Sequence, residues 1–469
     1  MKAKVLVAAL ALLVSVAGIA QTGNPAYEVS PSRYDYSPAA RQITEGCTDK
    51  YDQVKAIYRW LCANISYDTS YTIYTADECW DNQRGVCQAY CELFYRLAEP
   101  LGIDVHVITG TSKNELDPAG SHAWLFVVVE DGAGILIDPT WGAGSVNGKT
   151  FIRNENDMSW FHVDPYWMIF THFPDDAMYQ FLPTPITRER FDSLPIIKPV
   201  WGEYGCEAEA VFNRCMAGHT DFPKFYKEGV GYIRLVNAPM EKTLRVGQVY
   251  TFAFQKLADC EVALINEDFY TNWQYRDGIY SMDFIPVKPG EVSWSIQKKG
   301  EKHYWSVVEY EVPNATRADL ANLERRDPML MPEIARLRNM DAGSLRRYGI
   351  DGKRLLAAVR SGEVKALPQF YNLGDVCTID EIPLNETLRV GNSYTFSIRS
   401  RDNLSWAVIN EGGLVSLVER RFVYRRHADN RRTSESGRFE AVRAATGRRW
   451  LLELREIYRS VNEYEWRFF

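Results

Sequence analysis

The sequence predicts an α+β domain followed by two all-β sandwich modules, with a helical segment joining the two modules. Apolar residues recur at helical spacing in residues 51–65 and 87–102, and strand-like runs follow both stretches. The stretch 222–252 then recurs at 367–396. A charged stretch with helical periodicity separates the two copies.

The N-terminal end has the pattern of a secretory signal peptide over residues 1–20. Lys2 and Lys4 precede an apolar run with small residues at its end, and cleavage is expected before Gln21. The run is short for a bilayer span, which takes about 20 residues, and no later stretch looks transmembrane. We expect a secreted or periplasmic protein with no transmembrane segment after cleavage.

Residues 21–182 are predicted to form the α+β domain. The helix predicted at 87–102 ends with Pro100 and Gly102, as helices commonly do. Three runs rich in β-branched and aromatic residues follow it, namely "VHVITG", "HAWLFVVVE" and "GILIDPTW". Helices that precede strands in this way are typical of helices packed on an antiparallel sheet.

The repeat predicts the two β-sandwich modules, at 183–313 and 367–469, with a helical linker at 314–366. Both copies contain "TLRVG" followed by "YTF", at an offset of 144 or 145 residues. Alternating strand-like runs such as "EVSWSIQ" and "RRWLLELREI" follow the repeated stretch. The helical stretch fits either a spacer or a docking element.

Charge is unevenly distributed along the 469 residues. The net charge is −7, yet residues 419–469 contain thirteen arginines, no lysine and eight acidic residues. An acidic chain is not expected to bind nucleic acid. The arginine-rich stretch 419–432 suggests contact with an anionic polymer of the cell envelope, and a solvated face is the simpler interpretation.

Nine cysteines are present, which is an odd number, so at least one lacks a partner within the chain. No C-x-x-C motif occurs, which disfavours a zinc ribbon or a thioredoxin-like redox site. Cys206 and Cys215 are spaced for a local disulfide. We expect neither a metal nor a cofactor.

Three residues carry the predicted chemistry: Cys87, His122 and Asp138. Cys87 opens a helix, His122 opens a strand, and Asp138 ends the next strand. A helix N-terminus and a nearby imidazolium stabilise a thiolate, lowering its pKa from about 8.5 to roughly 3.5–7.5. The histidine can then protonate a leaving group while the aspartate orients it. Gly85, just before the cysteine, would leave room for a substrate.

Two other sets of residues are alternative candidates for a functional site. Cys91 lies one turn further along the same helical face as Cys87, where its N–H is tied into the helix, so we assign it to the core. His162 and His172 could form a second site with nearby aspartates. We prefer a structural role for both histidines, in packing the segment that closes the domain.

The blocks "GVCQAYCELFYRLAEPLGI" and "HAWLFVVVEDGAGILIDPTWG" resemble, in this order, the transglutaminase-like superfamily of papain-type folds. Residues 160–182 resemble the block that closes this domain in the kyphoscoliosis-peptidase-like branch, including its Thr-His-Phe-Pro motif. The resemblance covers roughly residues 40–185. It implies a papain-like catalytic domain, and immunoglobulin-like modules after it would suit that branch.

The resemblance implies that Cys87 is the nucleophile, His122 the acid and base, and Asp138 the partner that orients the histidine. The backbone N–H of Cys87 would supply one donor of the oxyanion hole. The second donor is usually a side chain upstream of the cysteine, and Gln83 and Trp80 are the candidates.

Tryptophans near the motifs suggest a substrate groove. Trp124 and Trp141, with Trp160, could line it, and the same residues could equally belong to the core.

We therefore expect an exported cysteine-nucleophile enzyme that attacks a protein or peptide carbonyl and forms a thioester at Cys87. Peptidase, deamidase and cross-linking outcomes all stay open, and hydrolysis is favoured. The alternative is a catalytically inactive scaffolding protein that binds through its β-sandwich modules. A Cys87 that is bridged to Cys79 or Cys91, or buried under the closing segment, would favour the scaffold.

Overall fold

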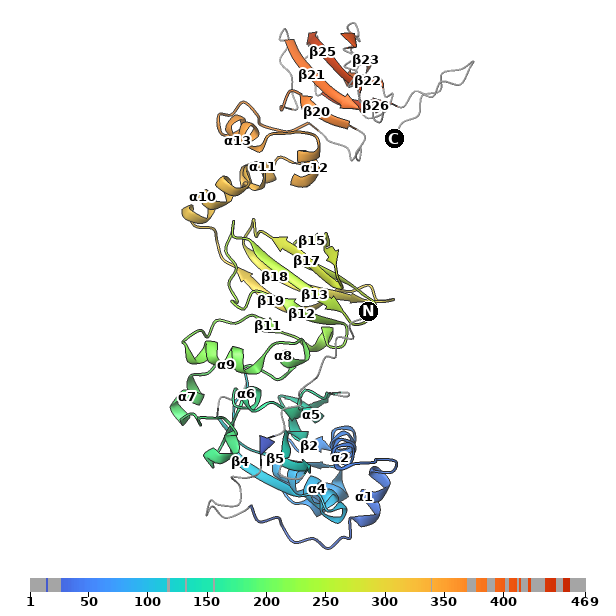
Figure 1. The fold of residues 1–469 in the computed structure, drawn as a ribbon, viewed down its shortest axis with the longest axis vertical. Helices are drawn as coiled ribbons and strands as arrows, with labels where there is room; N and C mark the ends of the chain where they lie inside the picture. Colours follow the sequence, from blue (N-terminus) through green and yellow to red (C-terminus); the bar gives the residue numbers. More distant parts are fainter. Residues whose placement is uncertain are drawn as a thin grey trace, which may run out of the picture. The chain divides into compact units, whose positions relative to one another are not determined.

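The computed structural model describes residues 14–15 and 27–368, apart from 116–118, 131–132, 155–156 and 339, and then 377–385 and the strands that follow (Figure 1). Residues 1–13 and 16–20 of the predicted signal peptide lie outside the described residues, as does most of the arginine-rich stretch 419–432. None of the helices within the described ranges is long and apolar enough to cross a membrane.

The chain divides into two compact units. The first comprises residues 1–242, 251–282 and 293–309, and the second comprises 243–250, 283–292 and 310–469. The predicted domain boundaries stay predictions.

Helices come first in the first unit, as the periodicity indicates. They are α1 (Ser37–Ile43), α2 (Lys50–Asn64), α3 (Ala76–Asn82) and α4 (Cys87–Ala98). Asp49 caps α2 by accepting the N–H of Asp52, and Thr75 forms a capping box with Glu78 at the start of α3. The helix predicted at 87–102 ends at Ala98, and one 3₁₀ turn (Glu99–Leu101) follows.

Apart from β1, the strands of an antiparallel sheet follow the helices, which confirms the predicted α+β class. Its strands run in the order β1-β6-β5-β4-β10, with β9 paired to β6. Their bounds are Val14–Ser15 (β1), Val105–Ser112 (β4), Gly120–Glu130 (β5), Ala133–Ile137 (β6), Phe161–Val163 (β9) and His172–Pro174 (β10).

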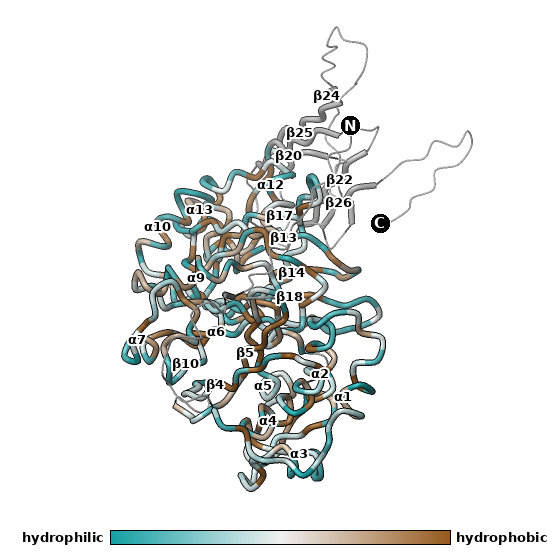
Figure 2. The backbone as a smooth tube through the Cα atoms, turned by 60° about the horizontal axis from the view of Figure 1, so that its bottom comes forward, coloured by the Kyte–Doolittle hydropathy of each residue, from teal (hydrophilic) through white to brown (hydrophobic). Residues whose placement is uncertain are grey.

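The core of this domain lies between α2, α4 and the central strand β5. Figure 2 shows apolar colouring along β5, where Trp124, Leu125, Phe126 and Val127 are at most 1% exposed. On α4, the buried apolar side chains recur at helical spacing: Ala89, Tyr90, Cys91, Leu93, Phe94 and Leu97. The burial of Cys91 confirms its assignment to the core.

Gly85 serves helix packing, which corrects the expectation that it leaves room for a substrate. A Cβ at this position would lie 2.6 Å from the Cβ of Ala89 and 3.1 Å from the Sγ of Cys79. The space in front of Gly85 is therefore already filled by α3 and α4, and only glycine lets the chain pass this close to them.

Short elements surround the sheet. β2 (Ser66–Tyr67) pairs with β3 (Arg84–Gly85) in parallel, and β7 (Gly144–Asn147) forms a hairpin with β8 (Thr150–Arg153). The short helices are α5 (Pro139–Ala143), α6 (Pro165–Met168), α7 (Arg188–Ser193), α8 (Val200–Glu203) and α9 (Ala208–Met216).

The first copy of the repeat forms two sheets, ordered β11-β19-β18-β14-β15 and β12-β13-β17-β16. Phe252 and Phe254 of β13 contact Trp294 of β18 at ring-centroid distances of 5.1 and 6.0 Å, so the two sheets face each other. The strands are Lys224–Phe225 (β11), Ile233–Asn237 (β12), Tyr250–Lys256 (β13), Cys260–Asn266 (β14), Asp268–Tyr270 (β15), Gln274–Arg276 (β16), Ile279–Phe284 (β17), Gly290–Lys298 (β18) and Trp305–Val312 (β19).

The second unit contains the charged helical stretch. Its helices are α10 (Arg317–Arg326), α11 (Pro332–Ala335), α12 (Ala342–Arg347) and α13 (Gly352–Arg360). They bury apolar side chains of their own, among them Leu323, Ile334, Leu345, Leu355 and Leu356.

The second copy of the repeat forms the same strand pair as the first. β20 pairs with β21 from Cys377 opposite Ser400, as β12 pairs with β13 from Ile233 opposite Lys256, each position 144 residues later. The register of both pairs shifts at the equivalent place. An immunoglobulin-like fold for the copies stays a prediction. The strands are Cys377–Glu381 (β20), Ser393–Ser400 (β21), Ser405–Asn410 (β22), Gly413–Leu414 (β23), Arg421–Phe422 (β24), Glu435–Arg443 (β25) and Trp450–Arg455 (β26).

Candidate active site

Three separate elements bring Cys87, His122 and Asp138 together. Cys87 is the first residue of α4, His122 lies on β5, and Asp138 directly follows β6. Because β5 and β6 are antiparallel neighbours, the start of one strand lies beside the end of the other, as expected from the sequence. The His122 Nε2 is 2.8 Å from the Asp138 Oδ2.

Asp138 is fixed from two directions. It is fully buried and is the N-cap of α5, where its Oδ1 accepts the backbone N–H groups of Thr140 and Trp141. Its other oxygen, Oδ2, faces His122. A buried carboxylate needs such partners, because an unpaired charge in the interior costs several kcal/mol.

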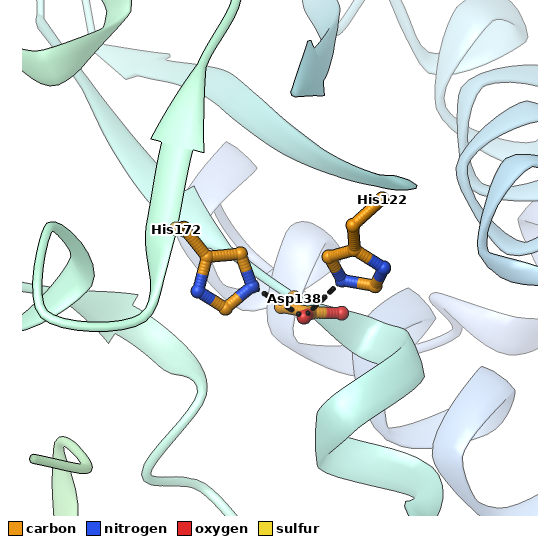
Figure 3. Close-up of side chains that lie close together, drawn as sticks. All are labelled: His122, Asp138 and His172. Carbon is orange, nitrogen blue, oxygen red and sulfur yellow. Dashed lines mark hydrogen bonds and ion pairs between the residues drawn. The ribbon is translucent and has the colours of Figure 1, made fainter. Parts of the chain in front are cut away.

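A second histidine completes the cluster, and no local pattern in the sequence indicates its contact. The Nε2 of His172, on β10, is 3.1 Å from the same Oδ2 of Asp138 (Figure 3). The two rings approach the carboxylate from either side, with their centroids 5.2 Å apart. We predicted that His172 packs the closing segment. It does so, and it also contacts the candidate catalytic aspartate.

Cys87 is partly exposed, and its sulfur accepts hydrogen bonds from the His122 ring and from the backbone N–H of Ala123. Burial alone would raise the pKa of the Cys87 thiol. The two hydrogen bonds and the charge of His122 overcome burial, so that the net shift of this pKa is downward. Since the Nε2 of His122 faces Asp138, its Nδ1 is the ring nitrogen left for the sulfur.

The pKa values of His122 and Asp138 are shifted in opposite directions. Burial would lower the pKa of His122, but the Asp138 carboxylate and Cys87 raise it well above its usual value. Burial would raise the pKa of Asp138, but both histidines hold it below its usual range. The arrangement therefore favours thiolate, imidazolium and carboxylate in a row, as nucleophilic cysteine chemistry requires.

The two predicted groove tryptophans differ in exposure. Trp124 is only 1% exposed and stacks against His122 at 6.1 Å, which favours the core over the substrate groove, the two alternatives that the sequence left open. It lies two residues after His122 on β5, and therefore on the same, covered face. Trp141 is partly exposed and lies 5.7 Å from the His122 ring, so its position next to the site is compatible with contact to a substrate.

The two residues expected to complete the oxyanion hole gain no support from their contacts. Trp80 stacks on Trp60 at 5.5 Å and meets Tyr36 edge-on at 5.5 Å, among the helices. Gln83 is exposed and ends α3 in the left-handed conformation. Both assignments stay predictions.

Tyr67 is a further upstream residue near Cys87, and the sequence analysis did not identify it. It lies on β2 directly opposite Gly85 of β3, two residues before Cys87. Burial raises the pKa of Tyr67, and the charge of Cys87 raises it further, so the phenol stays a neutral O–H donor. Its ring meets that of Tyr71, which is 61% exposed, at 6.1 Å.

The cysteines with described side chains are all free thiols, so the disulfide suggested for Cys206 and Cys215 does not form. Cys87 is bridged to neither Cys79 nor Cys91. A disulfide at Cys87, one of the two features there that would favour an inactive scaffold, is thus missing.

His122, Asp138 and His172 are also residue types that bind transition metals, and their ligand atoms lie within 4.8 Å of one another. All three are buried, and each of the nitrogens facing Asp138 already has a hydrogen-bond partner in its carboxylate. The hydrogen-bonded arrangement explains the geometry without an ion.

Comparison with known proteins agrees with this geometry. The model of the transglutaminase-like superfamily matches residues 37–165. The human kyphoscoliosis peptidase is 30% identical over 168 residues, which are 32% of this chain and 25% of that protein. The mouse kyphoscoliosis peptidase is 30% identical over 159 residues, covering 30% and 23%. Hillarin of Drosophila melanogaster is 27% identical over 193 residues, covering 36% and 24%.

The chain spans about a quarter of the length of these relatives. The match includes Cys87, His122 and Asp138, and the region around them has the α+β arrangement described above. Residues 37–165 are therefore a transglutaminase-like superfamily domain, of the branch to which the kyphoscoliosis peptidases belong.

Proposed function

We propose that this protein is a cysteine-nucleophile enzyme that cleaves or transfers acyl groups of proteins or peptides through a thioester at Cys87. The observation that carries the proposal is the 2.8 Å contact between His122 and Asp138 beside Cys87, whose thiol pKa is lowered by His122. The lowered pKa of Cys87 provides the thiolate, and the raised pKa of His122 provides the proton that a leaving amine needs.

In acylation, the Cys87 thiolate attacks the carbonyl carbon of a peptide bond or of a glutamine side chain. The resulting oxyanion is stabilised by the backbone N–H of Cys87 and by a second donor, for which we propose Tyr67, because it pairs opposite Gly85 and its pKa responds to the charge of Cys87. When the intermediate collapses, the C–N bond breaks and His122 gives its proton to the leaving amine. The product is a thioester, with His122 neutral.

In deacylation, the neutral His122 removes a proton from water or from an incoming amine. The nucleophile attacks the thioester carbon, the C–S bond breaks, and the Cys87 thiolate and the His122 imidazolium are restored. Water gives peptidase or deamidase activity, and an amine gives cross-linking. We favour hydrolysis, because Cys87 and the neighbouring Trp141 are both partly exposed, so that water can reach a thioester formed there.

The test is the pH dependence of Cys87 alkylation by iodoacetamide, followed by mass spectrometry in the wild-type protein and in His122→Ala. We expect rapid alkylation well below the free-thiol pKa of about 8.5 in the wild type, and loss of that reactivity in the variant. Slow alkylation, or equal profiles in both proteins, would show that no thiolate–imidazolium pair exists. The search would then turn to binding by the repeated β modules.

Two further proposals concern where the enzyme acts. The basic and apolar N-terminal pattern supports export, which N-terminal sequencing of the mature protein can test by finding Gln21 first. The arginine-rich stretch 419–432 supports contact with an anionic envelope polymer. We expect replacement of Arg425, Arg426, Arg431 and Arg432 by serine to release the protein from the envelope fraction. Unchanged retention would end this second proposal.

A further inference from the structure

The ring of His172 is held on every side, although it takes no part in the chemistry proposed above. The rings of Trp141, Trp124 and Trp160 surround it at centroid distances of 4.6, 5.0 and 5.3 Å. Its side chain has no exposed surface. A buried imidazole normally has partners for both nitrogens, so its hydrogen bonds define its protonation state.

Those hydrogen bonds fit one state of the ring. The Nε2 lies 3.1 Å from the Asp138 Oδ2, and the Nδ1 lies 2.9 Å from the Thr171 Oγ1. Burial lowers the pKa of His172 to about 4, so the ring is neutral near pH 7. A neutral nitrogen that faces a carboxylate oxygen must carry the hydrogen. His172 is therefore an Nε2–H donor to Asp138, and its Nδ1 accepts the hydroxyl of Thr171.

This donor acts on His122 through a shared atom. The Asp138 Oδ2 that accepts from His172 is the same oxygen that accepts from the His122 Nε2, at 2.8 Å. A second donor on one oxygen offsets part of its negative charge, which leaves less of it to stabilise an imidazolium. His122 must give up its proton to the leaving group, and a carboxylate that held this proton too strongly would slow that step.

We propose that His172 is a positioning residue that fixes the Asp138 carboxylate between two imidazoles and limits how strongly it holds the proton of His122. The proposal rests on the proposed function, in which His122 is the proton donor. The competing explanation is that His172 only packs the closing segment, through the pairing of β10 with β4.

The other titratable groups near His122 and Asp138 do not change the direction expected for the His122 pKa when the His172 donor is removed. Cys87 is the one that contacts His122 directly, and the test below removes it. Five other side chains interact with the charge of Asp138, and burial raises the pKa of each above its usual value, so they are neutral near pH 7: Tyr58, Cys62, Tyr67, Tyr90 and Cys91.

The experiment is an NMR titration of His122 in full-length protein carrying Cys87→Ser and ¹⁵N-labelled histidine, of which the chain has seven. It compares His172 with three replacements. His172→Gln places an amide N–H near the Nε2 position. His172→Asn places it near the Nδ1 position, out of reach of Asp138. His172→Phe keeps the ring and removes the donor.

We expect the His122 pKa to rise by roughly one pH unit in His172→Phe and His172→Asn. In His172→Gln it should stay near its value in the protein that retains His172. His106→Phe is the matched control, because His106 is a half-buried sheet histidine that contacts Phe126 and Tyr179. It should leave the titration of His122 unchanged. Thermal unfolding of each variant reports any loss of folding, and if His172→Phe fails to fold, the comparison of Gln with Asn decides.

An unchanged or lowered His122 pKa in the variants that lack the donor would overturn the proposal. So would a shift in His172→Gln as large as that in His172→Phe, since packing rather than the N–H would then be responsible. Because the titration is made without the Cys87 thiol, it does not depend on enzymatic activity. Failure of the proposed function would instead appear as an unreactive Cys87 in the alkylation experiment.

Discussion

Tyr67 lies directly opposite Gly85 in the short parallel pairing of β2 with β3, two residues before Cys87. The backbone of the following residue, Asp68, donates its N–H to the carbonyl of Gly85, which fixes the strand alongside the helix start. A phenol held in this position is upstream of the nucleophile and close enough for the charge of Cys87 to act on it.

Replacing Tyr67 by phenylalanine tests whether its hydroxyl stabilises the oxyanion. We expect Tyr67→Phe to lower kcat for a peptide-amide substrate by about 10²–10³-fold, the usual cost of one lost oxyanion donor. The rate of Cys87 alkylation should hardly change, because alkylation forms no oxyanion. Tyr74→Phe, at an exposed tyrosine of the same loop, is the control. Equal effects on turnover and on alkylation would speak for a role in packing.

Asp138 has two separable roles, and asparagine preserves one of them. An asparagine side chain at this position can still cap α5, but it cannot hold an imidazolium. We therefore expect Asp138→Asn to slow alkylation of Cys87 near pH 6 by at least about tenfold, which is one unit in pKa. Asp164→Asn is the matched control, because Asp164 caps α6 in the same way by accepting the N–H of Tyr166. Equal slowing in both variants would contradict the prediction.

The close contact of Gly85 with its neighbours predicts that alanine at this position destabilises the protein. In Gly85→Ala the new methyl group would meet the Cβ of Ala89 at 2.6 Å, and overpacking of this kind costs about 1–3 kcal/mol in the free energy of unfolding. Ala89→Gly removes the opposing methyl group, at a cost of about 1 kcal/mol in helix propensity. In urea denaturation, the double variant should lose less free energy of unfolding than the sum of the losses in the two single variants. Strict additivity of the two losses would mean that the two positions do not touch.

Lys113 predicts a pH dependence of stability in the alkaline range. Its ammonium group is buried and donates to the carbonyl oxygens of Phe191 and Leu194, at the end of α7. Burial lowers the pKa of Lys113 to about 8, from 10.5. Between these values the folded protein has released the proton and the unfolded chain still holds it, so the free energy of unfolding rises with pH.

The comparison with Lys113→Met isolates this contribution. Urea denaturation at about pH 7.5 and about pH 9.5 should show the wild type gaining stability relative to the variant as the pH rises. Groups elsewhere in the chain affect both proteins alike and cancel in the difference. A difference that stays constant, or that falls with pH, would show that Lys113 titrates normally.

Local patterns in the sequence were enough to predict the helices, the antiparallel sheet and the meeting of His122 with Asp138. The pairing of β5 with β6 follows from two adjacent strand-like runs, and a hairpin leaves little choice of register. Trp124 and His122 share a face of β5 because they are two residues apart on one strand. Both faces of β5 are buried from His122 to Val127, so this period alone does not separate a groove position from a core position.

His172 and Tyr67 could not be placed in the same way. The contact of His172 with Asp138 depends on the pairing of β10 with β4, and most of the sheet lies between these two strands in the sequence. Tyr67 lies on a strand of two residues, which is too short to show a period. Both contacts come from tertiary structure alone, and no local pattern of residues reports them.

The position of β10 in the chain has a consequence for biosynthesis. Cys87, His122 and Asp138 are all translated before His172, and β10 reaches the site only by pairing with β4. A nascent chain that has not yet extended through Pro174 therefore contains the nucleophile but lacks the final partner of its carboxylate. The cluster of His122, Asp138 and His172 can therefore form only after β10 has emerged from the ribosome and paired with β4.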